Sequence, residues 1–310
     1  MNGIIVIDKP SGKTSFDIIR DIRRVLKINK IGHTGTLDPL ATGVLPVCIN
    51  EATKLVQFLS QDDKEYRVTM LLGVETDTLD IEGKIVNQCE PDVRREDIEE
   101  VARSFVGKIE QKAPKYSAIK YNGRPLYKWT REGIDIDPPC RSIEIYKIII
   151  EDVTLPYVTF NVSCSKGTYV RSLCADMGTK LGCGACVFAL RRRKSGNFPE
   201  EVAVSLGGLD DRQKLRILKE NLIPIVDALP DFLSISVDQT LAERIRKGYQ
   251  PEAGILTGND IPSLIKGDLI KFLSAGDNIV AIGRMLFASE ELSSFHKKER
   301  VVKLLRVFNH

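Results

Sequence analysis

The chemical group that stands out in this 310-residue sequence is the carboxylate of Asp38. It lies in the segment IGHTGTLDPLATGVLPV, residues 31–47, with two glycines before it and Gly43 after it. Glycine permits tight backbone turns, and Pro39 disfavours the α region at the residue before it. The segment therefore predicts a turn that displays the carboxylate, which could act as a nucleophile. An Asp-Pro pair is also typical of a helix N-cap, and the local sequence leaves both interpretations open.

Two basic segments are candidates for contacts with nucleic acid. Residues 108–131, KIEQKAPKYSAIKYNGRPLYKWTR, hold seven Lys or Arg, one acidic residue, three tyrosines and one tryptophan. Basic side chains pair with phosphates, and aromatic rings stack on unpaired bases. Residues 191–194, RRRK, form an uninterrupted basic run. For both segments the alternative is a solvated surface, with the aromatic rings of the first packed on the body of the protein.

The overall charge excludes a uniformly basic protein. There are 45 Lys and Arg against 42 Asp and Glu, a formal net charge of +3, and 43% of the residues are hydrophobic. A basic face remains possible within that balance. The N-terminal residues show no signal-peptide pattern, and no apolar run approaches the length that crosses a bilayer. We expect a cytoplasmic protein with no membrane partner.

The cysteines indicate neither a disulfide framework nor a metal site. Their number, seven, is odd, and they are scattered along the chain, which is typical of buried free thiols in a reducing compartment. Cys183 and Cys186 form a CxxC motif, but structural zinc usually needs four ligands. The three histidines, His33, His296 and His310, are dispersed. We expect no bound metal.

The elements that must position Asp38 can be read from the first half of the chain. Residues 3–8 predict a strand, and KPSG then predicts a turn. Thr14 or Ser15 can cap an amphipathic helix over residues 16–26. Residues 66–72 predict another strand, followed by a polar loop at 73–83, and residues 100–105 have a helical pattern that ends at Gly107.

The second half predicts a change of architecture. Strands are expected at residues 142–150 and 157–163, and a helix over 173–181. A proline-containing stretch at 227–234 predicts a linker, and residues 239–248 a short helix. Glycine-punctuated apolar runs then predict strands and hairpins, in a small β-barrel or sandwich.

Five motifs, in order, resemble those of a known family. They are GIIVIDKPSGKTS, the Asp38 segment, KEYRVTMLLGVETDTLDIEG, GKIEQKAPKYSAIKYNGRPLYKWTREG and CSKGTYVRSLCADMGTKLGCGA, and LRRRKSGNF fits more loosely. Together they cover roughly residues 1–200 and resemble the pseudouridine synthase family whose bacterial members act on uridine 55 in the T loop of tRNA. GDLIKFL and NIVAIG resemble the RNA-binding PUA domain that often follows this catalytic domain.

This resemblance assigns roles to three residues around the reacting sugar and base. It implies that Asp38 is the nucleophile and that Arg171 forms an ion pair with it, since a neighbouring cation keeps a carboxylate ionised. It implies that Tyr169 contacts the nucleotide and guides a proton. Tyr169 would lie on the same side as Arg171 if that segment were extended. The reaction needs neither a cofactor nor a metal.

The resemblance also implies how the uridine is held. A uridine stacked inside a loop must be extruded before it can react. Tyr66 is implied to stack on the flipped base, Leu190 to form an apolar wall of its pocket and His33 to enter the RNA loop. For all three, ordinary packing or turn roles are the alternative. Residues with expected architectural roles around the site are Asp80, Thr76, Thr78, Lys9 and Pro10.

We therefore predict an α+β protein with two domains. The first, residues 1–230, is a catalytic domain on a mixed, largely antiparallel sheet, with an RNA-gripping insertion at about 108–133; the second, 231–310, is a small β-rich PUA-like module. The predicted partner is the T-arm stem-loop of tRNA, without a guide RNA or an obligate protein partner. One alternative is an RNA-guided pseudouridine synthase, which generally lacks the insertion. Another is a non-catalytic RNA-binding protein or RNA chaperone, and tRNA folding could also accompany catalysis.

Overall fold

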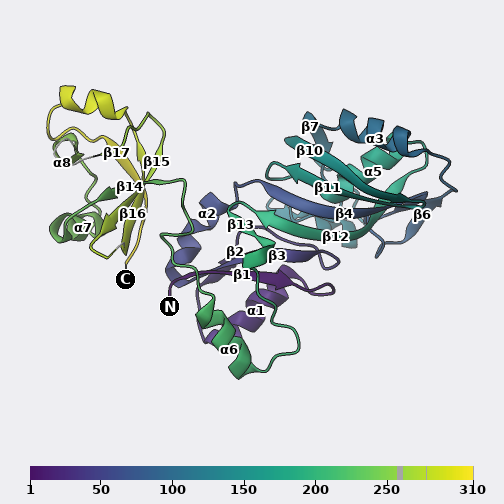
Figure 1. Ribbon diagram of the computed structural model, residues 1–310, viewed down its shortest axis with the longest axis horizontal. Helices are drawn as coiled ribbons and strands as arrows, with labels where there is room; N and C mark the ends of the chain where they lie inside the picture. The colour runs from purple at the N-terminus through teal and green to yellow at the C-terminus, as the bar shows by residue number, and fades with distance from the viewer. Residues whose placement is uncertain (257–260, 277, 310) are drawn as a thin grey trace.

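Two separate β-sheets organise the chain in the computed structural model, which describes residues 1–256, 261–276 and 278–309. Figure 1 shows a large sheet flanked by helices and, beyond the N-terminal strands, a smaller C-terminal sheet. The large sheet has nine strands with the central order β1-β3-β12-β4-β11-β10-β7. Its pairs are antiparallel except for β12 with β3. The predicted α+β class with a mixed, largely antiparallel sheet is confirmed.

The N-terminal strand and helix form as their sequence predicts. β1 (Gly3–Lys9) is almost fully buried and pairs with β3 (Thr42–Ile49), beside the short β2 (Ile31–His33). Thr14 caps α1 (Ser15–Leu26) by accepting a hydrogen bond from the backbone N–H of Asp17, whose carboxylate accepts in return from the Thr14 N–H. Such a reciprocal cap satisfies donors that the first helical turn leaves free. The isoleucines of α1 then pack into the core under the sheet.

The central strands carry the longest pairings of the molecule. β4 (Lys64–Leu72) lies between β12 (Ala185–Ser195) and β11 (Tyr157–Cys164). β10 (Cys140–Thr154) pairs with β11 on one side and with the edge strand β7 (Gly107–Lys112) on the other. Packed with this sheet are α3 (Arg95–Ser104) and α5 (Val170–Lys180). Smaller elements are η1 (Asn50–Leu55), α2 (Val56–Leu59), β8 (Lys120–Tyr121), β9 (Arg124–Pro125), α4 (Leu126–Arg131), β13 (Phe198–Pro199), η2 (Glu200–Val202) and α6 (Asp211–Glu220).

Three local predictions were wrong in detail. The expected polar loop at 73–83 contains β5 (Val74–Thr76), which pairs with β6 (Ile85–Gln88). The helix expected from residue 100 begins at Arg95, because a carboxylate three residues after Arg94 caps its first turn. Finally, α5 begins at Val170, so Tyr169 and Arg171 do not share one face of an extended segment. Arg171 instead projects from the first helical turn.

The C-terminal sheet has the order β14-β15-β16-β17. Its strands are β14 (Leu233–Ser236), β15 (Leu269–Ser274), β16 (Asn278–Met285) and β17 (Val302–Val307), and its helical segments are α7 (Gln239–Arg246), α8 (Ala253–Leu256) and η3 (Ser289–Ser294). The described residues thus form one four-stranded sheet where a barrel or sandwich was expected. Residues 257–260, 277 and 310 of the predicted module 231–310, including His310, lie outside the described residues.

Apolar contacts join the small sheet to the first strands of the large one. Phe308, Ile279 and Ile282 belong to the same buried cluster as Ile4 and Leu55. The stretch 227–234, expected to be a linker, contributes the buried side chains of Ala228 and Leu229 to this cluster. That stretch is therefore packed against both sheets instead of spanning solvent. Among the described residues, no helix is long and apolar enough to cross a bilayer.

Candidate active site

The carboxylate of Asp38 lies on an irregular turn between β2 and β3, and no helix follows it. The helix N-cap interpretation of the Asp-Pro pair is therefore wrong. The turn is fastened to the start of α1, where the Ser15 hydroxyl donates to the carbonyl of Leu37 at 3.1 Å and accepts from the Leu37 N–H at 2.8 Å. The Asp38 side chain remains 37% exposed, so a substrate can reach it.

A buried lysine fastens the other side of the same turn. Lys9 is 0% exposed, and its Nζ donates to the carbonyls of Pro10, Lys13 and Pro39 at 2.9, 2.6 and 3.2 Å. Burial lowers the pKa of Lys9 to about 8, although the negative charge of Asp38 acts in the opposite direction. The expected architectural role of Lys9 thus has a definite form, because its three donors connect the turn after β1 to the residue after Asp38.

Arg171 forms the ion pair with Asp38 that the sequence led us to expect. Its Nε lies 2.8 Å from Oδ2 of Asp38, and its side chain is 7% exposed. The remaining donors are also used, because Nη1 donates to the carbonyl of Thr78 at 2.8 Å and Nη2 to that of Tyr116 at 3.0 Å. A guanidinium held at three points presents a fixed fork to the carboxylate.

Asp80 supplies a second carboxylate to this arginine. Its Oδ2 lies 3.6 Å from Nη1 of Arg171, and the Asp80 side chain is almost completely buried. The Thr78 hydroxyl donates to Asp80 Oδ1 at 2.7 Å, and the Thr76 hydroxyl donates to the Asp80 carbonyl at 2.7 Å. The three residues of the TxTxD segment thus form a rigid wall behind Arg171.

Tyr66 and Leu190 lie on the adjacent strands β4 and β12 of the large sheet. In the register of β4 and β12, Leu190 is opposite Val68 and Arg192 is opposite Tyr66, and both Tyr66 and Leu190 are buried. Burial raises the pKa of the Tyr66 phenol, with Arg192 opposing the shift and the charge of Asp38 adding to it. A neutral aromatic ring and an aliphatic side chain together can form apolar walls for a base.

Tyr169 is the residue that caps the start of α5. Its backbone N–H donates to Oε1 of Gln111 at 2.8 Å, and Nε2 of Gln111 donates back to the Tyr169 carbonyl at 3.1 Å. Burial raises the pKa of the Tyr169 phenol. Sequence reasoning missed Gln111, a buried glutamine in β7 that orients this tyrosine through its backbone.

His33 ends β2, five residues before Asp38. Its Nδ1 is buried and has no hydrogen-bond partner among the described residues. Burial lowers the pKa of the imidazole, and the positive charge of Arg192 lowers it further. The histidine is therefore neutral at pH 7. A neutral imidazole can accept a hydrogen bond from an incoming group or donate one to it.

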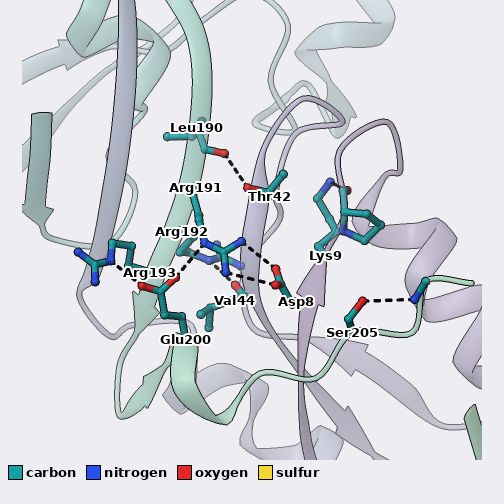
Figure 2. A network of polar contacts seen from close by, with 12 residues as sticks. Asp8, Lys9, Thr42, Val44, Leu190, Arg191, Arg192, Arg193, Glu200 and Ser205 are labelled. Atoms are coloured by element: carbon teal, nitrogen blue, oxygen red, sulfur yellow. Dashed lines mark hydrogen bonds and ion pairs between the residues drawn. The ribbon is translucent and has the colours of Figure 1, made fainter. Parts of the chain in front are cut away.

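The basic run 191–194 is only partly the solvated surface considered from its composition, because Arg193 and Lys194 are exposed but Arg192 is buried. It forms the end of β12, where side chains alternate between the two faces of the sheet (Figure 2). Arg191 pairs with Asp8 and Glu200, and Arg193 pairs with Glu200. Arg192 points the other way and is 1% exposed. A run of like residues does not reveal which one faces inward, so Arg192 could not be singled out from the sequence.

The predicted insertion, residues 108–133, contributes both to the sheet and to the surface. Its first residues belong to β7, while β8 and β9 form a separate two-stranded sheet that α4 follows. Most of its basic side chains are exposed, and three of them pair with acidic residues that follow: Lys115 with Asp135 at 2.6 Å, Lys112 with Asp137, and Arg124 with Glu132. The Arg124 guanidinium also lies over the Trp129 ring.

The chain matches two family models that together cover residues 23–229. They are described as TruB family pseudouridylate synthase (N terminal domain), matched over residues 23–170, and tRNA pseudouridylate synthase B C-terminal domain, matched over 171–229. It is 51% identical over 309 residues to a protein named tRNA pseudouridine synthase B from Syntrophus aciditrophicus, covering 100% of this chain and 99% of that protein. A protein of the same name from Geobacter sulfurreducens is 40% identical over 315 residues, with 100% of both chains covered.

Solved structures share the fold over nearly the whole chain. The crystal structure of a Cbf5-Nop10-Gar1 complex matches with a TM-score of 0.76 and 28% identity, covering 98% of this chain and 84% of that one. An H/ACA RNP bound to a substrate RNA containing 2'-deoxyuridine matches with a TM-score of 0.75 and 26% identity, covering 99% and 85%. These matches include the C-terminal sheet, as the predicted PUA-like module requires. On the family models and the full-length relatives, the chain belongs to the TruB family of pseudouridylate synthases.

Proposed function

We propose that this protein converts uridine 55 in the T loop of tRNA to pseudouridine, with Asp38 as the nucleophile. The observation that carries the proposal is the ion pair between Asp38 Oδ2 and Arg171 Nε, at 2.8 Å, on a carboxylate that substrate can reach. The names of the relatives, tRNA pseudouridine synthase B, support tRNA as the substrate. The position of the uridine rests on the resemblance of the motifs.

In the proposed reaction the N1–C1′ bond breaks, the uracil turns, a C5–C1′ bond forms and the C5 proton is lost, while N1 gains a proton. No electrons are gained or lost, so no cofactor is needed. The Asp38 carboxylate assists by attacking the sugar or the base, in a bond that breaks again before the product leaves, and its ion pair with Arg171 keeps it oriented. Tyr169, whose phenol has its pKa raised by burial, guides the proton.

Base flipping precedes this chemistry in the proposal. Unstacking a loop uridine costs a few kcal/mol, which stacking in a pocket can offset. Tyr66 stacks on the flipped base, Leu190 closes the pocket and His33 enters the RNA loop. We further propose that residues 1–230 form the catalytic domain, that the insertion at about 108–133 grips the T arm, and that the PUA-like module 231–310 contacts tRNA.

The test uses a T-arm stem-loop with tritium at C5 of its uridines, incubated with the purified protein alone. We expect label release by the wild type, none by Asp38→Asn, and none from a stem-loop with cytidine in place of uridine 55. An inactive wild type that still binds the RNA would overturn the proposal. Release that requires added guide RNA would favour the RNA-guided alternative. Any tRNA-folding activity should survive Asp38→Asn, since that substitution leaves the RNA-binding surface intact.

A further inference from the structure

Among the residues that the structure describes, Arg192 is the largest with a fully buried side chain, and the proposed reaction gives it no role. Its neighbours in the run 191–194 are neutralised, because Arg191 and Arg193 pair with Asp8 and Glu200. Arg192 itself forms no ion pair with a carboxylate among the residues that the structure describes. Removing a charge from water is costly, and an apolar side chain of similar volume often serves stability equally well. Stability alone therefore gives a poor account of an arginine at this position.

The guanidinium instead binds two backbone carbonyls on two different segments. Nε donates to the carbonyl of Val44 in β3 at 2.6 Å, and Nη2 donates to the carbonyl of Gly35 at 3.0 Å. Gly35 lies in the turn that carries Asp38, three residues before it. Figure 2 shows the first of these hydrogen bonds, with Arg192 reaching from β12 across to Val44. The planar, rigid guanidinium thus sets the distance between the sheet and the turn at residues 34–41 that carries Asp38, called here the nucleophile turn.

The backbone at Arg192 links these hydrogen bonds to the strand of the stacking tyrosine. In the sheet, residue 192 is opposite Tyr66 in β4 and beside Gly43 in β3. Gly43 has φ +96°, and a Cβ there would lie 2.2 Å from the Arg192 carbonyl oxygen. Only glycine allows that approach, since any side chain would push β3 away from β12. The nucleophile turn, β3 and the Tyr66 strand therefore meet at one residue.

The charge of Arg192 is also felt by the polar side chains of the site. It acts against protonation of His33, Lys9 and Lys64, and it lowers the pKa of the Tyr66 phenol against the larger effect of burial. A cation placed among other cations weakens the folded state electrostatically. Its location at the junction of Gly35, Val44 and Tyr66 is thus better explained by the geometry that it imposes.

We infer that Arg192 is a positioning residue for the reaction, whose guanidinium holds the turn carrying Asp38 at a fixed place relative to the strand carrying Tyr66. This inference rests on the proposed function. Arg192 touches no reacting atom in this assignment. It acts through Gly35 on Asp38, and its guanidinium acts directly on the Tyr66 phenol, whose pKa it lowers. A displacement of about 1 Å at such a site can cost roughly a hundredfold in rate.

The kinetic test compares Arg192→Met and Arg192→Lys in the tritium-release assay. We expect kcat of the methionine variant to fall roughly tenfold to a hundredfold with little change in KM. The lysine variant should recover only part of this activity, because its ammonium keeps the charge but cannot reproduce the planar guanidinium. Arg67→Met and Arg67→Lys are matched controls, since Arg67 lies next to Tyr66 in β4, pairs with Glu151 and is half exposed. Their kcat should stay within twofold of the wild type, and urea unfolding should remain cooperative in all four variants.

A second measurement tests the position of the Arg192 charge in the absence of substrate. The chain has only three histidines, so imidazole resonances can be followed by NMR during a pH titration. Removal of the positive charge in Arg192→Met should raise the pKa of His33, whereas Arg67→Met should leave the pKa of His33 unchanged. The inference would be overturned if kcat of Arg192→Met stayed within twofold of the wild type, or if only its KM changed. Failure of Arg192→Lys to fold would also overturn it. An inactive wild type in the same assay would count against the proposed function instead, because the titration stands independently.

Discussion

Two groups of cations surround the candidate site, and they differ in what neutralises them. Lys9, Arg171 and Arg192 are buried and bind backbone carbonyls in fixed directions, with Arg171 also bound to carboxylates. In the insertion, Lys112, Lys115 and Arg124 pair with acidic side chains at the surface. Exposed ion pairs contribute only about 0–1 kcal/mol, so an RNA phosphate can replace the acidic partner. The buried group therefore sets geometry, and the exposed group is available for binding.

The largest effect should come from breaking the buried group at Arg171. Arg171→Met removes the cation from Asp38 and leaves the buried Asp80 carboxylate without it. We expect kcat for tritium release to fall roughly 10²–10³-fold, the range found when one preorganised electrostatic interaction is removed. We also expect the free energy of unfolding, measured in urea, to fall by about 3–5 kcal/mol. The Arg67→Met control should change neither quantity appreciably, and activity of Arg171→Met within tenfold of the wild type would contradict this view of the buried group.

The dependence of kcat on pH should show the titration of a second buried cation, Lys9. Its pKa is lowered from 10.5 to about 8 by burial, and a neutral amine has two N–H donors for three carbonyls. We therefore expect kcat to decline several-fold as pH rises above about 8, because the turn at Pro39 loses an anchor. Lys9→Arg stays charged throughout this range and should lack that inflection. An identical inflection in Lys9→Arg would assign it to another group.

The same titration should act on stability in the opposite direction. Because the folded-state pKa of Lys9 lies below that of the unfolded chain, the unfolded state binds more protons between about pH 8 and 10.5. The contribution of Lys9 to the free energy of unfolding therefore rises with pH in that window. Urea unfolding of the wild type and Lys9→Arg at pH 7.5 and 9.5 measures this difference. Activity and stability that fall together above pH 8 would show that the decline in activity is simply unfolding.

A smaller effect, confined to binding, should follow from removing cations of the insertion. In Lys112→Ala/Lys115→Ala we expect KM for the stem-loop to rise severalfold while kcat stays unchanged. The slope of log KM against log salt should decrease by about 0.7–0.9 for each phosphate that is no longer neutralised by a lysine. Lys219→Ala, at an exposed position of α6, is the control. A fall in kcat at saturating RNA would remove the distinction between positioning and binding cations.

The smallest effect should come from releasing those cations from their acidic partners. Asp135→Asn/Asp137→Asn leaves Lys115 and Lys112 free to bind phosphate. We expect KM to decrease by roughly twofold to fivefold at low salt, since exposed pairs of this kind are weak. The difference should disappear near 1 M salt, where screening is strong. Weaker binding by the variant would mean that the acidic residues hold the insertion in its binding conformation.

The local sequence was sufficient where short-range physics dominates. The capping role of Thr14, the strand containing Tyr66 and the turn at Asp38 depend on residues only a few positions apart. The helix that begins at Val170 was placed three residues late, because the glycine and polar residues before it resemble a longer turn. That error changed how Arg171 projects, from a strand face to a helical turn, but not its partner.

The sequence by itself determined that a displayed carboxylate, a set of ordered family motifs and two basic segments are present. Only the tertiary structure decided which bases are buried. In RRRK, one residue in the middle faces the interior because β12 pairs with both β3 and β4, and no local signal reports those long-range partners. Likewise Asp80 and Gln111 reach Arg171 and Tyr169 only through sheet and loop contacts across the chain. The resemblance directed attention to Asp38, whereas the fold assigned Arg192 its place beside the nucleophile turn.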